Sequence, residues 1–212
     1  MELLLKITND LILRYPVLEI CRQDLIEAFL QIEKAIRAGG QILICGNGGS
    51  HSDAAHIVTE LMKSFDKKRP LNQKQIEALK QVDANLGQHL SKHLEQSIPA
   101  ISLSAHGALM TAISNDQGGD YIFAQQVIGY ANPKNILLAI STSGHSKNII
   151  NALVTAQALG LQTFGLTGAT GGKMRAYCDH CICVPSSHTP DIQELHLPVY
   201  HALCKFLEKS IF

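Results

Sequence analysis

Residues 41–50 read QILICGNGGS, a short apolar run that leads directly into a loop of glycine, asparagine and serine. The same pattern recurs along the chain: an apolar run rich in Ile, Val or Leu, then a loop of small residues and an amphipathic segment. The predicted strands are residues 41–45, 100–104, 135–140, 162–166 and 180–184. Short buried strands that alternate with helices pair in parallel, because each connection is long enough to recross the sheet. The sequence therefore predicts an α/β fold, with a doubly wound, five-stranded parallel sheet flanked by helices.

The first part of the chain is helical in character. Residues 1–38 show helical periodicity that is interrupted at Pro16, and the run ends at Gly39-Gly40. The apolar residues of its second half are spaced for one stripe: Leu25, Phe29, Ile32 and Ile36. These residues predict an N-terminal helical arm.

A polar segment interrupts the alternation of strands and helices at residues 66–97. It contains two expected short helices, around residues 73–81 and 86–96, and we interpret it as a helical insertion over or beside the site. No linker or low-complexity stretch divides the chain, so we expect one domain over residues 1–212.

Composition excludes several classes of protein. Lys+Arg and Asp+Glu each total 18, so the chain lacks the basic surface that nucleic acid requires. No run of 18 apolar residues and no leader-like apolar segment is present, which predicts a cytoplasmic protein without a membrane span. Six cysteines without paired spacings fit reduced thiols, and Cys181 and Cys183 fit a buried strand better than half of a zinc site.

Two loops carry the features of a phosphate site. Residues 46–50 (GNGGS) and 141–146 (STSGHS) each offer backbone N–H groups, hydroxyls and a following helix. Helix N-termini favour anions, and glycine lets the backbone approach closely. Either loop alone fits an ordinary strand-to-helix connection, but the pair favours a phosphate ligand. Neither loop matches the dinucleotide fingerprint, and no P-loop or nucleophile elbow is present.

Acid/base groups recur at helical spacing. His56 and Glu60 are four residues apart after the first loop, and Gln193 and His201 share one face of a C-terminal helix. A carboxylate and an imidazole suit aldose–ketose isomerisation, which needs a base for the α-proton and a group that moves a proton between two oxygens. An exposed helix pair and a core histidine remain alternatives, because spacing does not show that the helices meet.

Taken together, the ordered motifs resemble the sugar isomerase (SIS) domain family, most closely the phosphoheptose isomerases. The resemblance covers nearly the whole chain apart from the insertion. Its motifs are GNGGS at 46–50 with His56 and Glu60, STSG at 141–144, TG at 167–168, GGKM at 171–174, and IQELH at 192–196 with His201.

The resemblance implies a homotetramer with sites at subunit interfaces that converts sedoheptulose 7-phosphate to D-glycero-D-manno-heptose 7-phosphate. It implies Glu60 and His201 as the catalytic acid/base pair. The implied substrate-binding residues are Asn47, Gly48, Gly49, Ser50, Asp116, Ser141, Thr142, Ser143, Ser146 and Gln193. Some family members hold zinc, and the residues that match its ligands here are His56, Glu60, Gln193 and His201. Alternatives are a non-catalytic SIS protein that binds a phosphosugar or a protein, and an isomerase of another phosphosugar.

Overall fold

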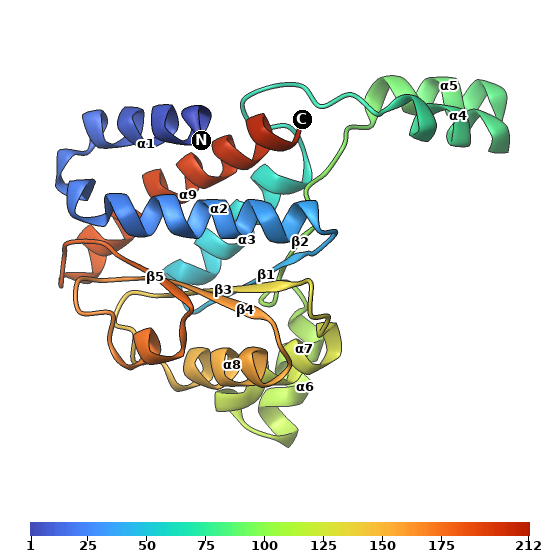
Figure 1. Ribbon diagram of the computed structural model, residues 1–212. Coiled ribbons are helices and arrows are strands. Elements are labelled where there is room, and N and C mark those ends of the chain that lie inside the picture. The colour runs from blue at the N-terminus through green and yellow to red at the C-terminus, as the bar shows by residue number, and fades with distance from the viewer.

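Five parallel strands form the centre of the molecule in the computed structural model, which describes residues 1–212 (Figure 1). Their order across the sheet is β2-β1-β3-β4-β5, and every neighbouring pair is parallel. The strands are β1 (Ile42–Gly46), β2 (Ala100–Ser102), β3 (Ile136–Ser141), β4 (Gln162–Thr167) and β5 (His180–Cys183). The predicted doubly wound, five-stranded sheet is confirmed, with strand ends that differ by one or two residues from those expected.

Helices cover both faces of the sheet, because successive strand side chains point to opposite faces. Ile42 and Ile44 of β1 belong to the larger apolar cluster, whereas Leu43 and Cys45 belong to the smaller one. On the larger cluster pack α1 (Glu2–Arg14), α2 (Arg22–Arg37), α3 (Gly49–Met62) and α9 (Thr189–Ile211). The opposite face carries α6 (Gly107–Asp116), α7 (Ile122–Tyr130) and α8 (Lys147–Ala158), as Figure 1 shows.

The N-terminal arm is helical and breaks where the sequence predicted. Helix α1 ends at Arg14, a 3-10 helix covers Pro16–Cys21, and α2 follows at once. Proline fixes its own backbone angle and disfavours helix in the preceding residue, which accounts for the break. The predicted apolar stripe of α2 is buried against the larger cluster. Two further 3-10 helices, Gly119–Tyr121 and Lys173–Tyr177, lie in connections. None of the helices combines the length and hydropathy that a membrane span needs.

The insertion forms a helical hairpin that projects from the body (Figure 1). Its helices are α4 (Gln73–Val82), which begins at a capping box on Asn72, and α5 (Ala84–His93), which Asp83 caps. The hairpin starts after α3 has returned the chain to the amino edge of the sheet, opposite the predicted phosphate loops. It therefore does not cover those loops, so that of the two expected positions, over or beside the site, the position over the loops is excluded. An antiparallel bridge between Pro70 and Glu95 closes its base.

His196 lies on the inner side of α9 and is fully buried. Burial lowers the pKa of its imidazole from 6.5 to about 4, so the folded protein holds it neutral. Between these two pH values the unfolded chain binds a proton that the folded chain does not, and the free energy of unfolding falls with falling pH. We expect this loss to reach about 3 kcal/mol at pH 4.

Urea unfolding of the wild type and of His196→Gln, measured from pH 7.5 to pH 4.5, checks this prediction. The variant should show the shallower dependence on pH. Equal slopes for the two proteins would mean that other groups cause the loss.

Candidate functional site

The two predicted phosphate loops lie side by side at the carboxyl edge of the sheet. Strands β1 and β3 are neighbours, and the chain visits β2 on the far side of β1 between them. Such a reversal of strand order opens a crevice where α/β proteins bind ligands. Asn47 of the first loop and Asn148 just beyond the second exchange two amide hydrogen bonds of 2.9 and 3.0 Å. The two loops therefore form one site.

The loop at 141–146 holds its hydroxyls close together. The Oγ atoms of Ser141 and Ser146 are 3.3 Å apart, and the backbone N–H of Gly144 donates to Ser141 Oγ at 3.2 Å. Ser143 Oγ accepts from the N–H of His145 at 3.2 Å. Ser146 is the N-cap of α8 without a side-chain capping bond, so the first N–H groups of the helix can receive an anion.

The loop at 46–50 brings the backbone against α9. Gly48 has a positive φ of 54° and precedes the first turn of α3, where Ser50 is buried. A Cβ atom on Gly49 would lie 2.1 Å from Nε2 of Gln193. Gln193 therefore lies at the phosphate end of the site. Asp116, at the end of α6, has no hydrogen bond or ion pair with either loop; Asn115 donates to it at 2.8 Å.

Helices α3 and α9 pack together and bring the predicted acid/base residues into one cluster. His56 Nε2 lies 3.2 Å from Glu60 Oε1. The rings of His56 and His201 meet edge to face with centroids 5.1 Å apart. Burial, and then the neighbouring His56, lower the pKa of His201, which favours the neutral imidazole, with one ring N–H to donate and one ring nitrogen to accept a proton. The two helices that spacing alone did not connect do meet.

Two further side chains orient His56. The hydroxyl of Tyr200 lies 3.0 Å from His56 Nδ1 and donates to Asp53 Oδ1 at 3.4 Å. Burial raises the pKa of both Asp53 and Tyr200. This chain fixes the imidazole of His56 with Nε2 toward Glu60. Neither Tyr200 nor Asp53 is among the predicted site residues, although Asp53 lies three residues before His56 on the same helix.

The four predicted zinc ligands do not converge within this chain. Gln193 and His201 are eight residues apart on α9, which is about 12 Å along the helix. No group of three or more His, Cys, Asp or Glu side chains has the spacing of a formed metal site. His56, Glu60 and His201 nevertheless supply the nitrogen and oxygen donors that zinc accepts. Nε2 of His201 is buried without a hydrogen-bond partner, which leaves it available to a ligand.

The phosphate loops and the acid/base cluster are the two ends of one track along α3 and α9. Ser50 and Glu60 are ten residues apart on α3, about 15 Å along its axis. A cleft of about 300 Å³ opens beside His201, between α1, α9 and the segment after α3. Its lining includes Arg14, Phe65 and Lys205. The track thus separates the predicted phosphate loops from the predicted acid/base cluster.

The loops at the strand-order reversal and the carboxylate–imidazole cluster at the other end of the track are features of an α/β protein that binds a phosphorylated ligand. Residues 100–204 match the family model of the SIS domain. The chain is 37% identical to the phosphoheptose isomerase of Rhodospirillum rubrum, over 90% of this chain and 88% of that protein. It is 35% identical to that of Pelobacter propionicus, over 97% of each. The chain therefore belongs to the phosphoheptose isomerases of the SIS domain family.

Solved structures agree with this assignment. A phosphoheptose isomerase from Francisella tularensis superposes with a TM-score of 0.76 at 29% identity, covering 92% of this chain and 91% of that one. The enzyme from Neisseria gonorrhoeae gives a TM-score of 0.74 at 28% identity, with the same coverage.

Proposed function

We propose that this chain isomerises sedoheptulose 7-phosphate to D-glycero-D-manno-heptose 7-phosphate through an enediol(ate) intermediate. The observation that carries the proposal is the cluster of Glu60, His56 and His201 on α3 and α9, in a chain similar to phosphoheptose isomerases over most of its length. An aldose–ketose isomerase needs this pair of groups, one carboxylate and one imidazole, beside a phosphate anchor.

The two loops hold the phosphate in this proposal. The hydroxyls of Ser50, Ser141, Ser143 and Ser146 and the N-terminus of α8 donate to its oxygens. Asn47, Thr142, Asp116 and Gln193 contact the sugar, and Gly48 and Gly49 let the backbone approach it. The site achieves this without a lysine or arginine, because hydroxyls, backbone N–H groups and a helix dipole together favour an anion.

Proton transfer falls to Glu60 and His201. Glu60 removes a proton from C1 of the ketose, and the electron pair moves into the C1–C2 bond as the carbonyl oxygen O2 takes a proton from His201. His201 then recovers a proton from O1, and Glu60 returns its proton to C2. The product is the aldose, and both side chains return to their starting protonation states. Tyr200 and Asp53 keep the neighbouring His56 in place during these steps.

We propose zinc as the metal for the same cluster, because its side chains supply the nitrogen and oxygen donors that zinc accepts. His56, Glu60 and His201 would hold it, and Gln193 would need to come from a second copy of the chain because of its distance along α9. When bound, zinc would polarise the carbonyl and stabilise the enediolate. A carboxylate that ligates zinc is a weaker base, so the roles of Glu60 as ligand and as base compete.

We also propose a cytoplasmic homotetramer whose sites lie at subunit interfaces. Large apolar side chains are exposed on and after α1, with Leu13 81% and Ile20 77% exposed. Exposed apolar surface of this kind marks interaction sites. Three consecutive bonds of an extended chain span about 3.8 Å, so the extended substrate measures about 10 Å from C1 to phosphorus. The distance of about 15 Å between Ser50 and Glu60 along α3 exceeds this length. A second copy would bring a loop closer to the acid/base cluster.

Incubation of the protein with sedoheptulose 7-phosphate, followed by proton NMR of the aldose, tests the function. Wild type should form the aldose, and His201→Gln should slow it by about 10²–10⁴-fold. His89→Gln on the projecting hairpin serves as the control and should match wild type. Parallel samples with added zinc and with a chelator test the metal. Absence of product from folded, zinc-supplemented wild type would refute the assignment.

A further inference from the structure

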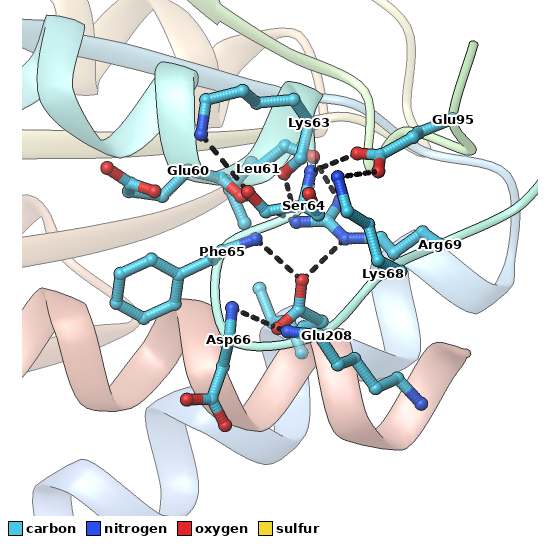
Figure 2. Close-up of polar contacts among 12 residues, drawn as sticks. Glu60, Leu61, Lys63, Ser64, Phe65, Asp66, Lys68, Arg69, Glu95 and Glu208 are labelled. Atoms are coloured by element: carbon cyan, nitrogen blue, oxygen red, sulfur yellow. Dashed lines mark hydrogen bonds and ion pairs between the residues drawn. The ribbon is translucent and has the colours of Figure 1, made fainter. Parts of the chain in front are cut away.

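An arginine from outside α3 caps the helix end that carries Glu60. The guanidinium of Arg69 donates to the backbone carbonyl of Glu60 at 2.6 Å and to that of Leu61 at 2.7 Å, and also bonds the carbonyl of Lys63 (Figure 2). The last carbonyls of a helix lack partners within it and carry its negative dipole end. Arg69 supplies hydrogen-bond donors to these carbonyls and a positive charge at this end of the helix, and its side chain is fully buried.

Glu208 on α9 holds this arginine and the segment that follows α3. Its Oε1 accepts from Arg69 Nε at 2.7 Å and from the N–H of Phe65 at 2.8 Å. Its Oε2 accepts from the N–H groups of Asp66 and Lys67 at 2.7 and 3.0 Å. Burial alone would raise the pKa of Glu208, but hydrogen bonds from Phe65 and Arg69 outweigh it and lower the pKa. The carboxylate is therefore charged and fully satisfied.

We propose that Arg69 and Glu208 form a clamp that positions Glu60 against His201, an inference that rests on the proposed function. The clamp joins the two helices that carry the acid/base pair. Arg69 fixes the peptide of Glu60 itself. Glu208 lies seven residues after His201, two turns along the same side of α9. Both are positioning residues, because neither touches the substrate.

Phe65 extends the clamp to the imidazole. Its N–H is held by Glu208, and its ring lies 5.4 Å from the His201 ring at an angle of 41°. Figure 2 shows the side chains of Phe65 and Glu60 on the same side of the segment that Arg69 and Glu208 bind. A displaced clamp would therefore move both members of the acid/base pair.

A purely structural role is the competing explanation. Buried ion pairs are often replaceable by apolar residues without loss of stability, whereas removal of one partner is strongly destabilising. Loss of stability alone therefore does not test the clamp. Its distinctive prediction is a loss of turnover per folded molecule, with substrate binding by the distant phosphate loops retained.

Arg69→Lys and Glu208→Gln test the proposal, with Arg37→Lys in the exposed pair with Glu33 as the matched control. Assays are run below the thermal midpoint of each variant, with the folded fraction measured by circular dichroism. We expect kcat to fall by about 10²-fold in both clamp variants. KM should change by no more than about twofold. Arg37→Lys should retain wild-type kcat, and unchanged kcat in the clamp variants would overturn the proposal.

The His201 ring-proton chemical shifts give a readout that does not depend on activity. We expect both clamp variants to shift these resonances, because the ring of Phe65 moves; unchanged shifts would overturn the clamp even if the wild type failed to isomerise the heptose phosphate. If neither clamp variant folds, Phe65→Leu tests the proposal instead, because it leaves the ion pair of Arg69 and Glu208 intact. It should lower kcat and shift the His201 resonances, and wild-type values for both would contradict the clamp.

Discussion

Glu60→Gln is expected to lower kcat for the heptose phosphate by about 10³-fold or more, within the range of a positioned general base. The amide keeps the size of the side chain but does not accept the C1 proton. Glu60 is mostly buried against His56, so water is a poor substitute. The measurement is the initial rate of aldose formation, with KM and the thermal midpoint recorded for the same preparation.

Exchange of the C1 proton in heavy water separates the two roles in the pair. Glu60→Gln should abolish this exchange, whereas His201→Gln should retain part of it because the base remains. Glu27→Gln on α2, an exposed carboxylate far from the track, is the control and should leave both rate and exchange unchanged. Persistent C1 exchange in Glu60→Gln would assign the base to another group.

Gly144→Ala should raise KM by about 100-fold, which corresponds to about 3 kcal/mol of lost phosphate binding. Gly144 has a φ of +66°, and a Cβ atom there would lie 2.2 Å from the carbonyl oxygen of Gly171. Since neither backbone can yield without moving the loop, the serines at 141, 143 and 146 lose their common geometry. Each hydrogen bond to a charged group is worth about 1.5–3 kcal/mol, so loss of one or two accounts for the effect.

Gly160→Ala is the matched control for this substitution. Gly160 also has a positive φ, +78°, but no atom lies within 4 Å of the added Cβ. The Gly160→Ala variant should lose about 1–2 kcal/mol of stability from backbone strain and keep the KM of the wild type. Inorganic phosphate titrated against both variants measures the anchor directly. Equal KM values for the two variants would place the phosphate away from the 141–146 loop.

The sheet and its phosphate loops could be predicted because their signals are local. Apolar runs such as residues 135–140 and the small residues that follow them report strand and loop without reference to the rest of the chain. Parallel pairing then puts the loops at one edge. Helical spacing similarly paired His56 with Glu60, and the structure brings the two within 3.2 Å.

Contacts between distant segments could not be predicted from the sequence. Glu208 and Arg69 are 139 residues apart, and Arg69 stands in a basic run that reads as a solvated surface. Tyr200 and Asp53 meet only because α9 packs on α3. The separation of Gln193 from His201, in contrast, could be predicted from the sequence, since eight residues of a helix span about 12 Å. Spacing alone was sufficient to question a four-residue zinc site within one chain.

The projecting hairpin also bears on how such isomerases diverge. Its two ends meet at the bridge between Pro70 and Glu95, so the closure of the body is the same whatever length of chain extends beyond it. Doubling a loop adds only about 0.6 kcal/mol of closure entropy. Evolution can therefore lengthen, shorten or rewrite residues 71–94 almost freely. The helices beyond the bridge can therefore change in length without altering how the body closes beneath them.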